Sequence, residues 1–165
     1  MHLRIDLIKT KHMKYIRLIA GLFVFSLYFN ACKKDGISSV EEIGYGTSFG
    51  MCAGYCLNNV VIITDGKVAF SKSNNGINPT TKTCTKDIAE TDINVLKTLV
   101  DIDKFSKLPE VIGCPDCADG GAEWVSLRLN GEIKKVTFEY GREPEELKDM
   151  VAKLREIKES FNDCN

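Results

Sequence analysis

The chain has 165 residues, of which 44% are hydrophobic and 27% are charged, and its formal net charge is −1. This length and composition are those of a globular protein with one domain. The charge shows no basic excess, which argues against nucleic acid as a partner, because such binding needs clustered cations.

An apolar run near the amino terminus predicts an export signal. Lys14 and Arg17 precede the run at residues 18–29, and Ala31 stands directly before Cys32. The run has the length of a signal-peptide core and is shorter than the roughly 20 residues that a membrane-spanning helix needs. The segment resembles a bacterial lipoprotein signal, although phenylalanine replaces the usual leucine three residues before the cysteine. The resemblance implies a lipidated Cys32 at the mature amino terminus; a plain cleaved signal with an ordinary thiol is the alternative.

Cleavage after residue 31 would change the chemistry of the chain. Residues 1–31 contain five Lys or Arg and one Asp, so the remaining 17 basic and 22 acidic residues give a net charge of −5. His2 and His12 are also removed, and the mature chain then has no histidine. This excludes Ser-His-Asp and Cys-His catalysis and zinc sites with imidazole ligands. We therefore expect a protein that is not an enzyme and has no cofactor. Met13 is an alternative start that gives a signal of conventional length.

The first half of the mature chain predicts a tether followed by a hairpin. Residues 32–46 are polar and contain three glycines, which is typical of a flexible tether, so we expect a single domain over residues 47–165. Strands over 60–63 and 67–70 flank Asp65-Gly66, a typical two-residue hairpin turn. Residues 71–83 predict a loop, with a short strand near 80–85.

The second half predicts helix, loop, hairpin and helix. An apolar stripe over residues 91–103 that extends to Phe105 indicates a helix, and an irregular loop follows over 111–123. Residues 125–140 alternate apolar and polar side chains around Asn130-Gly131, as in a hairpin with one buried face. A last helix over 144–161 has apolar residues along one side.

A hairpin followed by a helix thus occurs twice. Isolated hairpins need cover to be stable. The simplest arrangement is one antiparallel sheet built from the two hairpins, with both helices packed on one face. The predicted fold class is therefore α+β.

Short motifs carry a resemblance to a known family. Cys52, Gly54 and Cys56 form a Cys-x-Gly-x-Cys motif that precedes the Asp-Gly turn. Later motif positions are Phe105, Leu108, Pro144 and Leu147, whereas Ala53, Leu57 and Asn59 depart from the family's usual aromatic residue, Pro and Tyr. With these motifs, residues 52–161 resemble an uncharacterised family of small domains, classed as a domain of unknown function and frequent in bacterial lipoproteins. The resemblance supports a small exported domain and implies no activity.

Six cysteines remain after Cys32, namely Cys52, Cys56, Cys84, Cys114, Cys117 and Cys164. An even number in an exported domain indicates three disulfides, for which sequence alone allows 15 pairings. The short-range pairs are 52–56 and 114–117, which would leave 84 with 164.

The spacing of the cysteines also fits two other interpretations. Cys52, Cys56, Cys114 and Cys117 have spacings that suit a four-thiolate zinc site, but an oxidising compartment disfavours free thiolates. The motif at residues 114–117, CPDC, has the spacing of a thiol-redox pair, yet the residues after it are poor helix formers, and active pairs begin a helix.

The same loop offers one more site. Asp116, Asp119 and Glu123 bring three carboxylates together, which is a candidate set of oxygen ligands for a hard cation, against a solvated acidic loop as the alternative. Trp124 beside them is expected in the core or at its rim, or as an anchor for a partner.

These features predict a lipid-anchored envelope protein whose domain is a binding or structural module for another protein. The alternatives are a thiol-redox or metal-handling protein that uses the CPDC loop, and an inhibitor of a secreted enzyme. Lys33 follows the lipidation site, where aspartate retains lipoproteins in the inner membrane of well-studied Gram-negative bacteria. By analogy, we expect the outer membrane.

Overall fold

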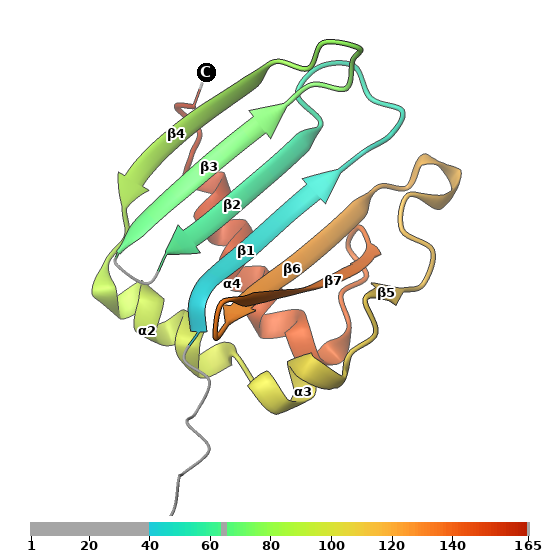
Figure 1. Ribbon diagram of the computed structural model, residues 1–165. Helices are drawn as coiled ribbons and strands as arrows, with labels where there is room; N and C mark the ends of the chain where they lie inside the picture. The colour runs from blue at the N-terminus through green and yellow to red at the C-terminus, as the bar shows by residue number, and fades with distance from the viewer. Residues whose placement is uncertain (1–39, 64–65, 165) are drawn as a thin grey trace, which may run out of the picture. The chain divides into compact units, whose positions relative to one another are not determined.

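A seven-stranded sheet dominates the computed structural model, which describes residues 40–63 and 66–164 (Figure 1). The strands lie in the order β4-β3-β2-β1-β6-β7-β5. Their bounds are β1 Val40–Ser48, β2 Leu57–Ile63, β3 Lys67–Ser73, β4 Thr81–Asp87, β5 Val111–Ile112, β6 Ala122–Leu129 and β7 Glu132–Glu139. Neighbouring strands are antiparallel except for β5, which runs parallel to β7.

The helices are α2 Glu90–Leu99, α3 Ile102–Lys107 and α4 Lys148–Glu159. In Figure 1, α4 runs behind the sheet, and α2 and α3 lie along its lower end. Two short 3-10 turns, η1 Cys117–Asp119 and η2 Glu145–Leu147, complete the set. Among the described residues, no helix has the length and apolarity to cross a membrane.

The core lies between α4 and one face of the sheet, called the inner face below. Alternate residues of five strands are buried there: Ile43, Tyr45, Val60, Ile62, Val68, Phe70, Val125, Leu127, Val136 and Phe138. From the helices, Leu96, Phe105, Met150, Val151 and Leu154 pack into the same cluster. The apolar side chains at every second position of the strands therefore pack in one layer with those along one side of α4.

The α+β class is confirmed, but the arrangement of two hairpins under two helices is wrong. Strand β1 lies between β2 and β6 and joins the hairpins into one sheet, while β4 and β5 extend the sheet at its two edges. In the part of the chain that the structure describes, three helices take the place of the two that were predicted.

The predicted tether is also wrong for residues 40–46, which form most of β1. The glycines that suggested flexibility are needed for close packing on the opposite, outer face. A Cβ atom on Gly46 would lie 2.3 Å from the Trp124 ring, and one on Gly44 would lie 2.3 Å from Ser126 Oγ. Such distances exclude any larger side chain without movement of the neighbour.

Helix boundaries differ in two places. The helix predicted over 91–103 ends at Leu99, and α3 starts as a separate helix whose N-cap, Asp101, accepts a hydrogen bond of 3.0 Å from the Lys104 N–H. Such a capping aspartate starts a new helix because it satisfies a free backbone donor. The last predicted helix, 144–161, is η2 followed by α4. The hairpin across Asn130-Gly131 is present, with positive φ at both residues.

Candidate binding site

Three loops that are distant in the sequence meet at one end of the sheet, called the loop end below. They comprise residues 49–56 between β1 and β2, 74–80 between β3 and β4, and 113–121 before β6. Figure 1 shows them along the upper edge and upper right, opposite α2 and α3. The antiparallel pairing of the strands places these connections at the same end.

Polar contacts join the three loops, and an aromatic contact joins the first loop to the segment after β7. The Asn75 side chain donates hydrogen bonds to the carbonyl oxygens of Phe49, at 2.7 Å, and of Gly50, at 3.2 Å. The Gly50 N–H donates to Asp116 Oδ1 at 3.3 Å. The ring of Phe49 packs edge-to-face on Tyr140, with 4.9 Å between centroids. The loops therefore support one another, which reduces the entropy that a partner must remove on binding.

Disulfides close two of the loops. Cys52 is bonded to Cys56 and Cys114 to Cys117, while Cys84 in β4 is bonded to Cys164 near the carboxyl terminus. These are the pairs named among the alternatives above. The four cysteines of the zinc hypothesis are therefore divided between two separate disulfides, so the structure gives that hypothesis no support.

The loop tips expose large apolar side chains. Met51 is 79% exposed, Ile77 is fully exposed, and Tyr55 is 38% exposed. Met51 and Tyr55 belong to the first loop and Ile77 to the second, and Asn75 bonds these two loops together. Loops that a rigid scaffold positions often carry the binding residues of a protein, so these exposed apolar side chains are candidates for contact with another protein.

The CPDC loop has an unusual backbone. Asp116, Ala118 and Asp119 have positive φ values of 60°, 52° and 59°, a conformation that costs free energy for residues other than glycine. Both cysteines are exposed, and with Arg142 and other residues they line a cavity of about 280 Å³. Cys117 opens only the three-residue turn η1, so neither cysteine stands at the start of an α-helix.

The three carboxylates that suggested a cation site have separate roles. Asp116 accepts hydrogen bonds from the N–H groups of Gly50 and Gly121, and Glu123 is fully buried on the inner face. Among the described residues, no group of three or more His, Cys, Asp or Glu is arranged to hold a metal ion. The strand alternation turns Glu123 inward, away from the acidic loop, so the structure gives no support to a shared cation site at Asp116, Asp119 and Glu123.

Below the loop end, Glu123 is the centre of a buried polar network that the sequence did not indicate. Arg155 from α4 binds both of its carboxylate oxygens, with Nε–Oε1 at 2.9 Å and Nη2–Oε2 at 2.5 Å. The Tyr45 hydroxyl donates to the same carboxylate, and so does the Gly141 N–H at 3.2 Å. Arg155 also binds Glu143 through two hydrogen bonds of 3.1 and 2.8 Å. The network fixes α4 against β1, β6 and the segment after β7.

Burial and pairing shift the pKa values of this network. Burial, followed by the hydrogen bond to Glu123, raises the pKa of Tyr45 far above its usual value. Hydrogen bonds from Arg155 lower the pKa of Glu143, and the bond to Glu123 raises that of Arg155. Tyr45 is thus neutral and Arg155 charged, and their hydrogen bonds to Glu123 hold α4 against the sheet.

Trp124 lies on the outer face, above Gly46. The ammonium group of Lys135 is 4.5 Å from the centroid of its ring, within reach of a cation–π contact. The side chain is half-buried, so it packs at a rim, which was one of the two roles expected for it.

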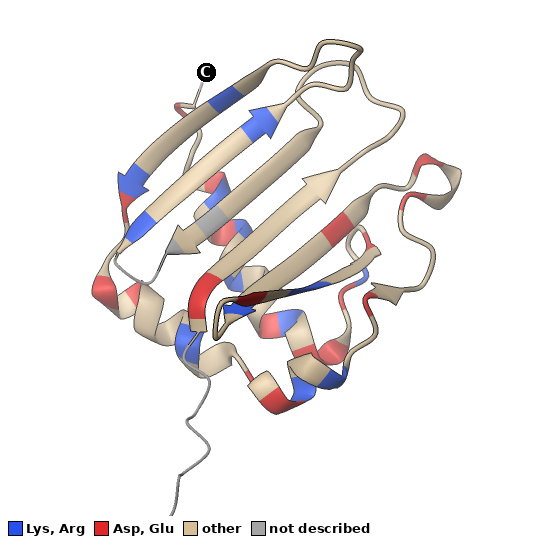
Figure 2. Cartoon of the chain, viewed as in Figure 1, with Lys and Arg blue, Asp and Glu red and all other residues tan. Residues whose placement is uncertain are grey.

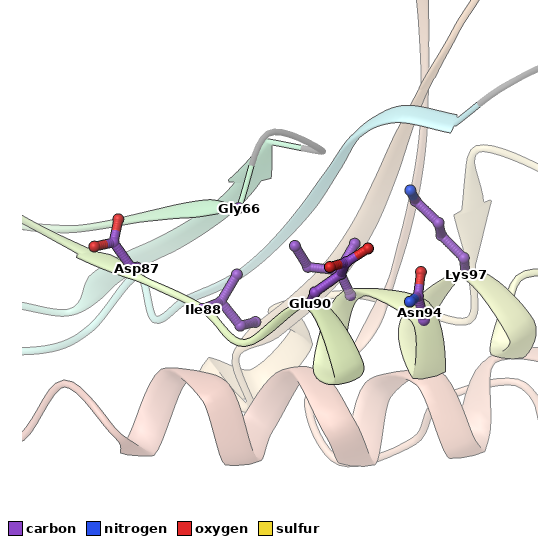
Figure 3. A pocket seen from close by; sticks show the side chains of 7 residues that line it. Gly66, Asp87, Ile88, Glu90, Asn94 and Lys97 are labelled. Atoms are coloured by element: carbon purple, nitrogen blue, oxygen red, sulfur yellow. The ribbon is translucent and has the colours of Figure 1, made fainter.

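A larger cavity, of about 430 Å³, lies at the end of the sheet opposite the loop end (Figure 3). Glu90, Asn94 and Lys97 rise from α2 on one side, and Asp87 at the end of β4 and Ile88 directly after it lie on the other. The described lining combines acidic, basic and amide side chains without a nucleophile, so we assign no chemistry to it.

Comparison with protein families finds no match for the chain, and no curated protein is similar to it. The resemblance to the family of unknown function therefore remains a prediction. Cys32, Lys33 and the predicted signal lie outside the described residues.

Proposed function

We propose that this protein is a lipid-anchored protein of the cell envelope, in the outer membrane, whose domain is a non-enzymatic binding module. Its partner is another protein, which it binds through the loop end. The observation that carries the proposal is the exposure of Met51, Tyr55 and Ile77 on loops that disulfides and hydrogen bonds hold in place.

The topology of β1 supports a tethered module. Val40, the first described residue, begins β1, and Ser48 ends it beside the loop end. The eight steps between the nine residues of β1, at about 3.3 Å each, separate these ends by roughly 26 Å. An anchor that precedes Val40 would therefore join the domain at the end opposite the exposed side chains. The loop end would remain accessible to a partner in the periplasm or at the surface.

Lipidation is tested by metabolic labelling with a fatty-acid probe. The wild-type chain should be labelled, and Cys32→Ala should not. Equal labelling of both proteins would contradict the anchor.

Binding is tested with a photo-cross-linking residue placed at Met51 or Ile77 in living cells. Both positions should yield the same discrete product. The control position is Ile133, which is 54% exposed but lies on β7 next to the turn at the other end of the sheet, and it should not yield that product. Met51→Asp with Ile77→Asp should abolish the product while the melting temperature stays within the error of the wild type. Identical products from all three positions would contradict a specific loop-end site.

One observation favours a second candidate, thiol–disulfide exchange at the CPDC loop. The Cys114–Cys117 disulfide is exposed beside a cavity, and exposed disulfides exchange more readily than buried ones. Titration with a mild reductant tests it. If the loop is redox-active, the reductant should reduce the Cys114–Cys117 disulfide before the other two, and reversibly. If the disulfide is structural, it should resist reduction until the domain unfolds. The remaining alternative is that this protein inhibits a secreted enzyme, and the partner bound at the loop end would then be that enzyme.

A further inference from the structure

Two lysines face each other at the loop end. Lys72 in β3 and Lys82 in β4 are directly opposite in the strand register. Like charges in this position repel and destabilise a sheet. Among the described residues, neither lysine takes part in an ion pair. The pair therefore reduces stability unless a ligand supplies negative charge.

Tyr55 holds the two lysines together. Each ammonium nitrogen lies 5.3 Å from the centroid of the Tyr55 ring, and the electron-rich face of an aromatic ring attracts cations. The Cys52–Cys56 disulfide closes the short loop that carries this ring. The three side chains are thus preorganised, and we call them the Lys72–Tyr55–Lys82 clamp.

The clamp lies where the core ends. On β3, Val68 and Phe70 are buried, but Lys72, the next residue on the same face, is half-exposed. In the same row across the sheet, Lys72 is opposite Asn58, and Asn58 is opposite Thr47. Thr47 is 2% exposed, and its hydroxyl has no hydrogen-bond partner among the described residues. A polar row therefore leads from the clamp into the domain.

The local charge is opposite to that of the whole domain. Residues 68–86 contain three lysines and no Asp or Glu, although the chain after residue 31 carries a net charge of −5. Figure 2 shows basic residues on β3 and β4, whereas acidic residues mark the loop that precedes β6. The lysines around the clamp thus favour a negatively charged ligand, whereas the acidic residues of the CPDC loop disfavour one.

We propose that the Lys72–Tyr55–Lys82 clamp binds carboxylate side chains of an acidic protein segment. Met51 and Ile77, exposed on the adjoining loops, contact apolar residues of the same segment. This inference rests on the proposed function, because it assigns the chemistry of the partner at the loop end. A protein segment fits better than a simple anion, since it alone uses both the cations and the apolar tips.

The probe is a fluorescent peptide of alternating Glu and Leu, titrated by fluorescence anisotropy against the full exported chain. Lys72→Gln with Lys82→Gln should weaken binding about fivefold or more at low salt, because two charged contacts are lost. The matched control, Lys97→Gln with Lys107→Gln, removes the same charge from α2 and α3 and should change the dissociation constant less than about twofold.

Stability gives an independent readout. The clamp variant should melt at or above the wild-type temperature, since it removes a repulsion between strands. An unchanged dissociation constant in the clamp variant, or an equal loss in the control, would overturn the inference. So would lysine-dependent binding to phosphatidylglycerol vesicles without binding to the peptide, since the ligand would then be a membrane. If peptide binding fails while cross-linking from residues 51 and 77 persists, the proposed function stands and the acidic partner does not.

Discussion

Replacing Arg155 with methionine tests the interpretation of the buried network. Glu123 is 0% exposed, and Arg155 supplies two of the four hydrogen bonds to its carboxylate. Methionine fills a similar volume but leaves the Glu123 charge unpaired in the core. Removing one partner of a buried ion pair costs about 3–5 kcal/mol, a large part of the roughly 5–15 kcal/mol that holds a domain together.

Urea denaturation measures the cost, and Trp124, the single tryptophan of the chain and the neighbour of Glu123, reports unfolding by fluorescence. With a slope of about 1–3 kcal/mol/M for small proteins, the midpoint should fall by roughly 2 M. Lys153→Met is the matched control on the same helix. Lys153 pairs with Asp92 and Glu156, which are 41% and 70% exposed, so its loss should cost less than about 1 kcal/mol.

A double variant separates charge burial from packing. Adding Glu123→Gln to Arg155→Met removes the unpaired charge, so this protein should be more stable than Arg155→Met alone. The reasoning is refuted if Arg155→Met costs no more than Lys153→Met, or if the added Glu123→Gln lowers stability further.

Three further predictions concern pH, a disulfide and the packing of β1. Arg155 lowers the pKa of Glu143 in the folded protein below its usual 4.5. The stability that this pair contributes is therefore present above pH 4.5 and is lost as the pH falls through the pKa of the folded protein. Unfolding measured along an acid titration should show a smaller loss of stability in Arg155→Met than in the wild type. Cys84→Ser with Cys164→Ser opens a bridge that spans 80 residues and should cost about 4 kcal/mol in thermal unfolding; an unchanged melting temperature would exclude this bridge. Gly46→Ala should cost about 1–3 kcal/mol by overpacking and shift the tryptophan emission, whereas an unshifted spectrum would contradict the close approach.

The sequence determined the features that depend on local period and local turn chemistry. Alternation from Val125 to Tyr140 around Asn130-Gly131 predicted β6 and β7, because a strand repeats every two residues and this turn needs positive φ. The stripe from Leu147 to Phe161 likewise predicted the buried side of α4. The even number of cysteines predicted three disulfides, and the pairs that are present are the two short-range ones together with the pair that these leave, 84 with 164.

Tertiary structure decided the features that depend on residues far apart in the chain. Strand β1 looked like a tether because its glycines suggest freedom, yet Trp124, 78 residues after Gly46, occupies the space above them. Glu123 looked like part of an acidic loop, and only the pairing of β6 with β1, together with the position of α4, turns it toward Arg155. The clamp arises in the same way, since strand register and a disulfide bring Lys72, Lys82 and Tyr55 together. In each case the deciding contact joins segments whose own sequence patterns carry no information about the partner.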